Sequence, residues 1–473
     1  MHASFLDFVD RDAELSRLRR SEADGGLVVV WGRRRVGKTR LLLEWVRAAG
    51  GLYWVADEST PALSRRSLAE ALSAKLPGFG EARYDDWPSL LGRLARDAKS
   101  VGFRGPLVID EIPYLLASSP QLASALQRFI DHDARRAGLL VALAGSAQHM
   151  MQGLTLDPSA PLWGRARELI KLRPIPAGYL QAAFDLEHPS DAVRAWALWG
   201  GIPRYWELAA SFPSSLEAAD ALVLDPLGPL HDEPTRLLLE ELPSASSLRP
   251  LLEAIGAGAH RVSEIAGRIG QPATSLARAL TRLQELEMVV RETPFGEPER
   301  STKRALYKLA DPFLRLWFAV VAPRRSQLLV ATRKGRLKLL GERLPHLVAA
   351  AWEDLCRQAV PRLGPALGEA SWGAAPRFWS GSGPEWDLVS AGSDGSILVG
   401  EAKWTEREPT LADIDRTVAA LRAKGAPRGH ATTAGISIAV FFPNLPKGAR
   451  RKYAGHGVHL VDAQQVLHAL REE

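Results

Sequence analysis

The stretch Val28-Val29-Val30-Trp31-Gly32-Arg33-Arg34-Arg35-Val36-Gly37-Lys38-Thr39 decides the fold class of this chain. It fits the pattern G-x-x-x-x-G-K-[ST], with the fixed positions filled by Gly32, Gly37, Lys38 and Thr39. An apolar run at 27–31 precedes the loop and an amphipathic run at 41–46 follows it, which predicts a strand, a loop and a helix. The N–H groups of such a loop and helix start can hold phosphates. The stretch therefore predicts the binding of a nucleoside triphosphate.

The predicted nucleotide contacts span the whole loop. We expect the Lys38 ammonium to reach the β- and γ-phosphates of ATP and the Thr39 hydroxyl to bind Mg²⁺. A chance glycine-rich turn is the alternative, and the flanking strand and helix argue against it. The residues predicted to line the nucleotide are Gly32, Arg33, Arg34, Arg35, Val36, Gly37, Lys38, Thr39 and Arg40.

A second predicted strand ends in adjacent carboxylates. The run Pro106-Leu107-Val108-Ile109-Asp110-Glu111 is short and apolar until its last two residues. At the tip of such a strand Asp110 can hold Mg²⁺ through water, and Glu111 can polarise the attacking water. The alternative is a strand that ends in a solvated acidic turn. The phosphate-binding loop upstream favours the catalytic interpretation.

Two further polar residues lie at the ends of predicted strands. Ser146 follows the strand at 139–144, where it could sense the γ-phosphate or simply close a turn. Arg165 precedes a strand at 167–175 and is a candidate arginine finger, with an ordinary surface arginine as the alternative. With another strand at 51–56, the alternation of strands and helices predicts a parallel, doubly wound α/β sheet.

Length and composition narrow the type of protein that this chain can be. The chain has 473 residues, of which 46% are hydrophobic and 24% charged, so several globular domains are expected. A single cysteine, Cys356, suits a reducing cytoplasm. The uncharged stretch 137–156 is broken by polar residues, which predicts a buried strand and loop and no membrane span. Residues 324–473 hold 21 Lys and Arg against 15 Asp and Glu, a surplus compatible with a polyanionic partner.

The middle of the chain has the pattern of a winged helix-turn-helix. Three short amphipathic segments, 251–255, 262–269 and 274–288, are separated by glycine-containing turns. Two strand-like runs, 289–291 and 305–309, can pair as a wing. The third helix offers polar side chains for phosphates and base edges, but many winged helices bind protein instead. Both alternatives stay open.

The last third of the chain has its own pattern of carboxylates. Glu401 and Lys403 are two residues apart on a predicted strand, so both point to one face, and Asp387 can meet them across a hairpin. Glu353 lies on the apolar face of a helix predicted at 346–360, whereas Asp354 falls on the solvated side. Converging carboxylates beside a lysine can bind Mg²⁺ and activate water at a phosphodiester.

Taken together, these motifs resemble the archaeal-type ATPases of the AAA/STAND group. The segment Phe8-Val9-Asp10-Arg11-Asp12-Ala13-Glu14 is similar to that group's N-terminal motif at the adenine, with Asp10 in place of the usual Gly. The stretch Gly201 to Pro203 is similar to the group's G-x-P in the lid helices over the base. The resemblance implies adenine contacts from Arg11 and Pro203, and a winged helix after the ATPase domain.

The C-terminal pattern resembles the PD-(D/E)xK nuclease superfamily. This resemblance implies metal binding by Glu353, Asp387 and Glu401, and activation of water or of the transition state by Lys403. The alternative is a surface hairpin with an ordinary salt bridge between Glu401 and Lys403.

These expectations combine into one architecture. A P-loop ATPase domain at 1–176 is followed by a helical lid at 177–246, a winged helix-turn-helix at 247–323 and an α/β restriction-endonuclease-like domain at 324–473. The predicted function is a cytoplasmic, ATP-hydrolysing switch coupled to a DNA-directed effector that could be a Mg²⁺-dependent nuclease. The alternative is a regulatory ATPase whose C-terminal domain only binds protein or nucleic acid. Arg135 and Arg136 join Arg165 as candidate fingers, and the oligomeric state is left open.

Overall fold

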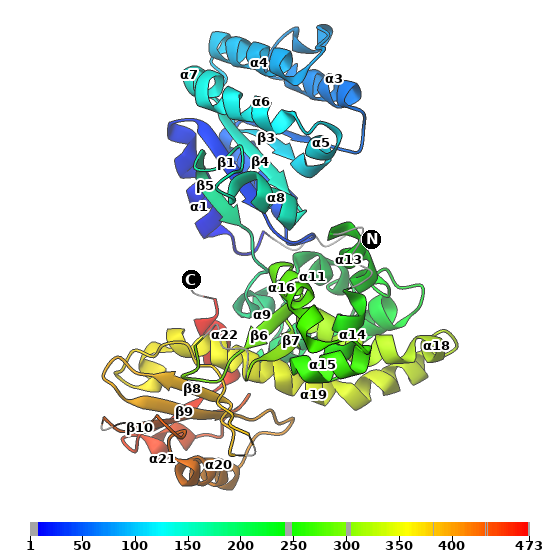
Figure 1. The fold of residues 1–473 in the computed structure, drawn as a ribbon. Coiled ribbons are helices and arrows are strands. Elements are labelled where there is room, and N and C mark those ends of the chain that lie inside the picture. The colour runs from blue at the N-terminus through cyan, green and yellow to red at the C-terminus, as the bar shows by residue number, and fades with distance from the viewer. Residues whose placement is uncertain are drawn as a thin grey trace. The chain divides into compact units, whose positions relative to one another are not determined.

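The computed structural model describes residues 8–241, 248–298, 304–381, 383–430, 432 and 434–471. The chain divides into two compact units (Figure 1). The N-terminal unit is Asp10–Pro174, and the C-terminal unit holds the chain from Ile175 onward together with the residues before Asp10. This division lies two residues from the boundary expected between 176 and 177. The boundary expected between 246 and 247 lies outside the described residues.

The N-terminal unit is built on a five-stranded parallel sheet, as predicted. Its strands are β1 (Gly26–Trp31), β2 (Leu52–Val55), β3 (Leu107–Asp110), β4 (Leu140–Gly145) and β5 (Ala166–Lys171), in the order β2-β3-β4-β1-β5. Strands β1 and β4 are almost wholly buried, as their apolar sequences require. Because β4 lies between β1 and β3, its carboxyl end lies between the carboxyl ends of those two strands.

Helices surround this sheet. They are α1 (Asp12–Arg20), α2 (Lys38–Ala49), α3 (Pro61–Leu72), α4 (Trp87–Val101), α5 (Ile112–Ser118), α6 (Leu122–Arg128), α7 (Arg135–Ala137) and α8 (Gln148–Thr155). Helix α2 starts directly at the end of the phosphate-binding loop and ends at Gly50, whose φ of 67° suits a glycine.

The C-terminal unit begins with helices. They are α9 (Leu180–Ala183), α10 (Pro189–Trp199), α11 (Pro203–Ala209), α12 (Ser215–Ala219) and α13 (Glu233–Glu241). Next come α14 (Arg249–Gly256), α15 (Val262–Ile269) and α16 (Ala277–Glu285), then the antiparallel strands β6 (Val289–Glu292) and β7 (Leu306–Leu309). The three predicted helices and the predicted strand pair are confirmed. The third α-helix begins at Ala277 because residues 273–276 form a 3₁₀ turn.

A long helix leads into the second sheet. After α17 (Pro312–Leu316) and α18 (Arg325–Leu328), α19 runs over Arg333–Ala359 and contains Pro345. The sheet consists of β8 (Leu388–Ala391), β9 (Ile397–Ala402), β10 (Ile436–Phe441) and β11 (Val458–Val461), in the order β11-β10-β9-β8. Strands β8 and β9 are antiparallel and the other pairs are parallel. Its helices are α20 (Leu411–Lys424), α21 (Ala449–Tyr453) and α22 (Ala463–Ala469).

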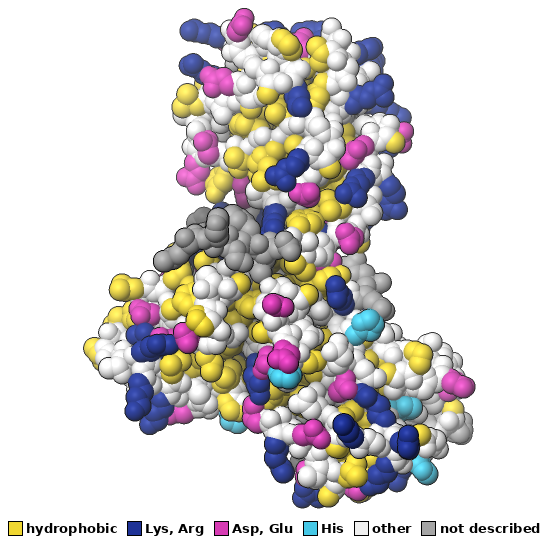
Figure 2. All heavy atoms as spheres, turned by 180° about the vertical axis from the view of Figure 1, so that it is seen from behind, with side chains coloured by type: hydrophobic (Ala, Val, Ile, Leu, Met, Phe, Trp, Pro, Cys, Tyr) yellow, Lys and Arg dark blue, Asp and Glu magenta, His cyan; other side chains and the backbone are white. Residues whose placement is uncertain are grey.

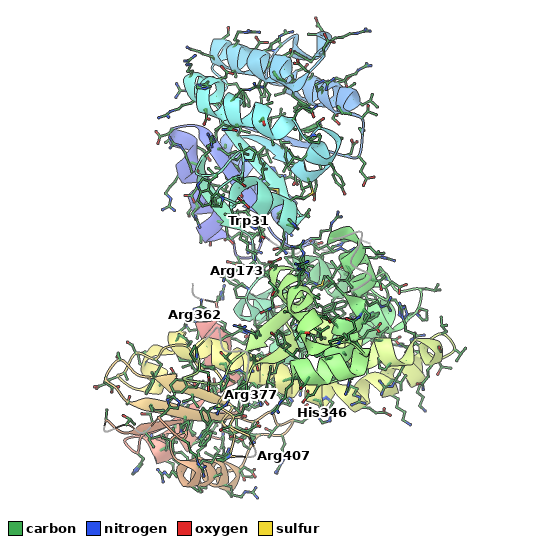
Figure 3. All side chains as sticks on the ribbon, viewed as in Figure 1. Trp31, Arg173, His346, Arg362, Arg377 and Arg407 are labelled. Carbon is green, nitrogen blue, oxygen red and sulfur yellow. The ribbon has the colours of Figure 1, made fainter. Side chains whose placement is uncertain are left out.

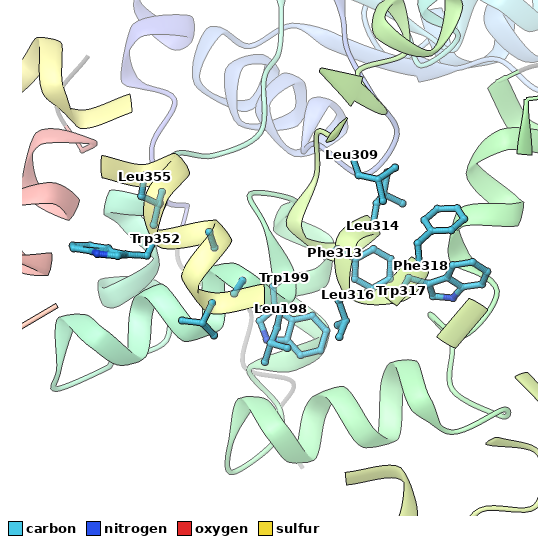
Figure 4. Close-up of a cluster of buried hydrophobic side chains, with 14 of the residues drawn as sticks. Leu198, Trp199, Leu309, Phe313, Leu314, Leu316, Trp317, Phe318, Trp352 and Leu355 are labelled. Atoms are coloured by element: carbon cyan, nitrogen blue, oxygen red, sulfur yellow. The ribbon is translucent and has the colours of Figure 1, made fainter. Parts of the chain in front are cut away.

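One hydrophobic core runs through most of the C-terminal unit. It joins Trp199 of α10, Phe313 of α17, Trp317 directly after α17, and Trp352 of α19 (Figure 4). The same core continues onto strands β8 to β11, and a smaller core covers their other face. The segments expected as a lid, a winged helix and a C-terminal domain therefore share buried apolar surface.

In the part of the chain that the structure describes, no helix is long and apolar enough to cross a lipid bilayer. On the rear face of the molecule, several Lys and Arg side chains gather over the part that contains the C-terminal sheet (Figure 2).

Candidate functional site

The phosphate-binding loop lies between β1 and α2, as its sequence predicts. Gly37 has a φ of 96°, and at Gly32 a Cβ would lie 2.4 Å from the carbonyl oxygen of Leu172. Both positions therefore require glycine. The buried Lys38 ammonium donates to the carbonyl oxygens of Gly32, at 2.9 Å, and Arg33, at 3.2 Å. Trp31, labelled in Figure 3, ends β1 directly before the loop.

Thr39 and Asp110 come together beside this loop. The Thr39 hydroxyl donates to Asp110 Oδ2 at 3.3 Å, and the N–H of Glu111 donates to Asp110 Oδ1 at 2.8 Å. Asp110 is buried, whereas Thr39 is exposed. A hydroxyl and a carboxylate next to a phosphate-binding loop are the oxygen ligands that Mg²⁺ takes in proteins. The residues present therefore fit a magnesium ion.

Tyr53 is part of this site, and sequence reasoning missed it. Its hydroxyl donates to Asp110 Oδ2 at 2.6 Å. Burial and the Asp110 carboxylate raise the pKa of Tyr53, so the phenol stays protonated and remains a donor. The contact exists because β2 pairs with β3, with Val55 opposite Asp110. The only signal in the sequence is a polar residue in an otherwise apolar strand.

Glu111 is held by the end of strand β4. The Ser146 hydroxyl donates to Glu111 Oε1 at 2.6 Å, and the Ser146 N–H donates to Oε2 at 3.2 Å. Glu111 has a φ of 52°, in the left-handed region that favours glycine. Backbone strain at a polar strand end is typical of functional sites. Ser146 therefore does more than close a turn, because it fixes the direction of the Glu111 carboxylate.

Arg11 lies against the back of the loop. Its guanidinium donates to the carbonyl oxygens of Val36, at 3.1 Å, and Arg173, at 2.7 Å, and pairs with Glu14 at 3.1 Å. Asp10, which stands where the resembling motif has glycine, has a φ of 63°. These contacts make Arg11 a support for the loop, and its contact with adenine stays a prediction.

For the remaining candidates, the described residues of the N-terminal unit show no contact with the phosphate-binding loop. Arg165 donates from Nε to Asp131, at 2.8 Å and 3.0 Å to the two carboxylate oxygens. Arg135 and Arg136 are exposed on α7. Pro203 begins α11 in the C-terminal unit. The roles of these residues in catalysis or in base binding stay predictions.

A second group of candidates lies where β8 begins and β9 ends in the C-terminal sheet. Asp387 directly precedes β8, Glu401 lies on β9 and Lys403 directly follows β9. The Lys403 ammonium lies 2.5 Å from Glu401 Oε1, and the N–H of Ala402 donates to Asp387 Oδ2 at 3.0 Å. Glu353 projects from α19, which starts at Arg333 and is longer than predicted because Thr332 caps it.

The pKa shifts show that these four groups are electrostatic neighbours. Burial and the Glu401 charge raise the pKa of Asp387. Burial and the Asp387 charge raise the pKa of Glu353. Burial lowers the pKa of Lys403, but its hydrogen bond and charge interaction with Glu401 outweigh this, and the pKa is raised overall. The site therefore holds three carboxylates beside one lysine.

Two of these carboxylates also form ion pairs with other basic side chains. Glu401 also pairs with Lys424 at 3.2 Å, and Glu353 lies 3.6 Å from Arg357. Among the described residues no three His, Cys, Asp or Glu side chains are arranged to hold a metal ion. Metal binding by Glu353, Asp387 and Glu401 therefore stays a prediction, and it requires these side chains to turn. Lys424 and Arg357 were not identified from the sequence, because α20 and α19 reach the site through tertiary packing.

The expectation that Asp354 is solvated is wrong. Its side chain is only 17% exposed and pairs with Arg315 and Arg357. Burial raises the pKa of Asp354, but these two positive charges outweigh it and hold the pKa well below its usual range. The surface that looked solvated from the periodicity of α19 is covered by α17.

Comparison with known proteins finds separate matches for two parts of the chain. Residues 8–208 match the family model of an ATPase domain predominantly from Archaea. Residues 317–414 match a family of archaeal and bacterial proteins of unknown function. An uncharacterized protein of Methanocaldococcus jannaschii is 26% identical over 326 residues, which cover 67% of this chain and 70% of that protein.

Two solved structures are similar to this chain. A Walker-type ATPase of Pyrococcus abyssi superposes with a TM-score of 0.51 at 20% identity, over 66% of this chain and 96% of that one. The ORC2 protein of Aeropyrum pernix has a TM-score of 0.43 at 13% identity, over 72% of this chain and 96% of that one. The first likeness supports the fold of the parallel sheet and its phosphate-binding loop.

Proposed function

We propose that the N-terminal unit, whose residues match the model of an ATPase domain, hydrolyses Mg²⁺-ATP and thereby switches a DNA-directed effector in the C-terminal unit. The contact between Thr39 and Asp110 carries the first half of this proposal. The convergence of Glu353, Asp387, Glu401 and Lys403 carries the second half. In this account the effector is a Mg²⁺-dependent nuclease.

The N-terminal site has the groups that phosphoryl transfer to water requires. Lys38 would leave the loop carbonyl oxygens and bind the β- and γ-phosphates. Thr39 and Asp110 would hold Mg²⁺, which when bound neutralises charge on the phosphates. Glu111, held by Ser146, would accept a proton from the attacking water. Tyr53 would keep the Asp110 carboxylate in place.

The C-terminal site has groups suited to phosphodiester hydrolysis. Asp387, Glu401 and Glu353 would hold a divalent cation, which when bound lowers the pKa of water. Lys403 stays protonated, because its pKa is raised, and would stabilise the charge that develops on the phosphate. The two lysines now paired with Glu401 would then be released toward the negatively charged substrate.

A contact within the C-terminal unit supports coupling of this site to the helices that follow the ATPase domain. Arg194 of α10 pairs with Glu406 and lies 5.7 Å from the ring of Trp404. Trp404 directly follows Lys403, and its ring lies 6.1 Å from that of Trp352, the neighbour of Glu353. A shift of α10 would therefore act on residues at both sides of the carboxylates.

The second candidate function is a regulatory ATPase with a non-catalytic C-terminal module. The observation that favours it is the double ion pair of Glu401 with Lys403 and Lys424, which can be purely structural. This alternative predicts binding to protein or nucleic acid that depends on ATP, and no metal-dependent cleavage.

The ATPase half is tested by Lys38→Ala. We expect steady-state ATP hydrolysis, measured as phosphate release, to fall by at least about 100-fold, because an electrostatic contact to the transferred phosphate is lost. The matched control is Arg47→Ala, a positive charge on the exposed side of the same helix, which should hydrolyse ATP at the wild-type rate. Unchanged turnover in Lys38→Ala would refute the assignment of the loop.

A further inference from the structure

A cavity of about 370 Å³ lies where the strand pair β6–β7, helix α19 and the segment before β8 meet. We propose that this cavity binds a backbone phosphate of the nucleic acid on which the C-terminal site acts. The inference rests on the proposed function for its role, but it concerns binding alone. The residues that line the cavity are Gln284, Arg291, Glu292, Thr293, Arg357, Pro376 and Arg377.

The charges that line the cavity favour an anion. Arg291, Arg357 and Arg377 face a single acid, Glu292. Glu292 is itself paired with Lys308, at 2.8 Å, so its charge is compensated from outside the cavity. Arg357 and Arg377 also lie 3.8 Å and 4.0 Å from Glu292, so the lining sets three guanidinium groups beside one carboxylate. Planar guanidinium groups with several donors match the geometry of a phosphate.

Arg377, which lines the cavity, has an unused hydrogen-bond donor. Within the described chain, its Nε is buried and donates no hydrogen bond. A buried donor without an acceptor is unfavourable, so Nε would gain from a hydrogen bond to a ligand oxygen. The Arg377 Nη2 lies 3.3 Å from Glu385, and the guanidinium lies 5.8 Å from the ring of Trp379, contacts that hold it in place. Figure 3 labels Arg377.

The cavity is rigid on its other sides as well. Arg357, whose side chain is only 10% exposed, pairs with Asp354 of its own helix. The N–H of Phe295, beyond β6, donates to the carbonyl oxygen of Arg377 at 2.8 Å. This bond ties the strand pair to the segment before β8. Preorganised donors bind a phosphate at a lower entropic cost than mobile surface side chains.

The position of the cavity connects it to the carboxylates. Arg357 Nη1 donates to the carbonyl oxygen of Asp387 at 3.3 Å and lies 3.6 Å from Glu353. The Arg377 charge also lowers the pKa values of both acids, against the larger effect of burial. One arginine side chain therefore separates the cavity from the predicted metal ligands. A strand with one phosphate in the cavity would therefore lie close to those ligands.

The test is DNA binding without divalent metal, so that cleavage plays no part. The probe is a fluorescein-labelled oligonucleotide of mixed sequence, single-stranded and duplex, titrated with the full chain in EDTA and followed by anisotropy. We expect Arg377→Ala and Arg291→Ala each to weaken binding about tenfold. Each should also reduce the slope of log K against log salt by about one, as the loss of a phosphate contact does.

Two controls separate the cavity from general charge and from misfolding. Arg416→Ala removes an exposed positive charge on α20 and should bind like wild type. Arg377→Lys keeps the charge but loses the planar fork, so its affinity should fall between those of wild type and Arg377→Ala. Wild-type ATP hydrolysis and far-UV circular dichroism in each variant would show that the chain is folded.

Three results would overturn the inference. They are a wild-type chain that binds no DNA, cavity variants that bind like wild type, and an equal loss in Arg416→Ala. A loss in Arg278→Ala on α16 without any loss in the cavity variants would place the phosphate contact on that helix instead. Failure of the nuclease proposal is a different result, because it leaves this metal-free binding intact and abolishes only cleavage.

Discussion

Asp110 is the residue on which the nucleotide site depends. Its two oxygens accept hydrogen bonds from Thr39, Tyr53 and the N–H of Glu111. The sequence was sufficient to identify Asp110, Thr39 and Glu111 as candidates, because each lies at the end of a recognisable strand or loop. It was not sufficient to find Tyr53, because that contact depends on which strands are neighbours.

Replacing Tyr53 by Phe removes the phenolic donor to Asp110 Oδ2 and little else. We expect the concentration of Mg²⁺ that gives half-maximal ATP hydrolysis to rise about tenfold, as for the loss of a residue that orients a metal ligand. The measurement is the ATPase rate over a titration of Mg²⁺ at saturating ATP. An unchanged Mg²⁺ requirement would contradict a positioning role for Tyr53.

The pKa values of Asp387 and Glu353 lead to a prediction about pH. Both are raised, so protons compete with a metal ion at higher pH than they would at ordinary surface carboxylates. We expect the Mn²⁺ affinity of the C-terminal site to decrease as the pH falls toward these raised values. Calorimetric titration without nucleotide, in an Asp110→Asn background, isolates this site from the N-terminal one.

The matched variant for this titration is Asp387→Asn, which keeps an oxygen acceptor for the N–H of Ala402. It should bind Mn²⁺ at least about tenfold more weakly and show a smaller dependence on pH. Wild-type Mn²⁺ binding by Asp387→Asn, at every pH, would remove Asp387 from the predicted set of metal ligands.

At the scale of elements, helix α19 shows what periodicity can and cannot predict. Its apolar face was placed correctly, and Cys356 is buried on it. The polar side was misjudged, because Asp354 pairs there with Arg315 from α17. A helical pattern distinguishes apolar from polar positions, but it cannot show whether a polar position faces solvent or a buried partner.

The ion pairs of α19 predict a stability effect. Arg357→Met leaves Asp354 with one cationic partner and removes the charge facing Glu353 and Glu292. We expect the free energy of unfolding of the C-terminal unit to fall by about 3 kcal/mol. Urea denaturation followed by tryptophan fluorescence measures this change. The control is Arg343→Met on the exposed part of the same helix, and equal losses in both variants would contradict the prediction.

The order of the strands in the N-terminal sheet could not be predicted from the sequence either. The five strands of the N-terminal sheet were identified to within four residues of their observed ends, because each is a short apolar run. Their order, β2-β3-β4-β1-β5, depends on contacts between distant parts of the chain. That order brings Ser146 to Glu111. The ambiguous serine at the end of a strand thereby becomes a positioning residue.

At the scale of the whole molecule, the sequence predicts four segments and the structure has two compact units. The difference lies in the C-terminal unit, where α10, α17 and α19 share one core with the second sheet. Local patterns reveal the helices of each segment, but they do not reveal how much apolar surface the segments bury together. This shared core is the physical basis for expecting the helices after the ATPase domain and the carboxylate site to respond together.

The central claim is that the ATPase domain controls a metal-dependent nuclease site. The most direct measurement is cleavage of supercoiled and linear DNA with Mg²⁺ or Mn²⁺, with and without ATP, by wild type, Lys403→Ala and Lys38→Ala. We predict that Lys403→Ala loses cleavage and retains ATP hydrolysis, whereas Lys38→Ala loses the effect of ATP on cleavage. Cleavage that survives in Lys403→Ala, or a complete absence of cleavage alongside normal ATP hydrolysis, would contradict this account.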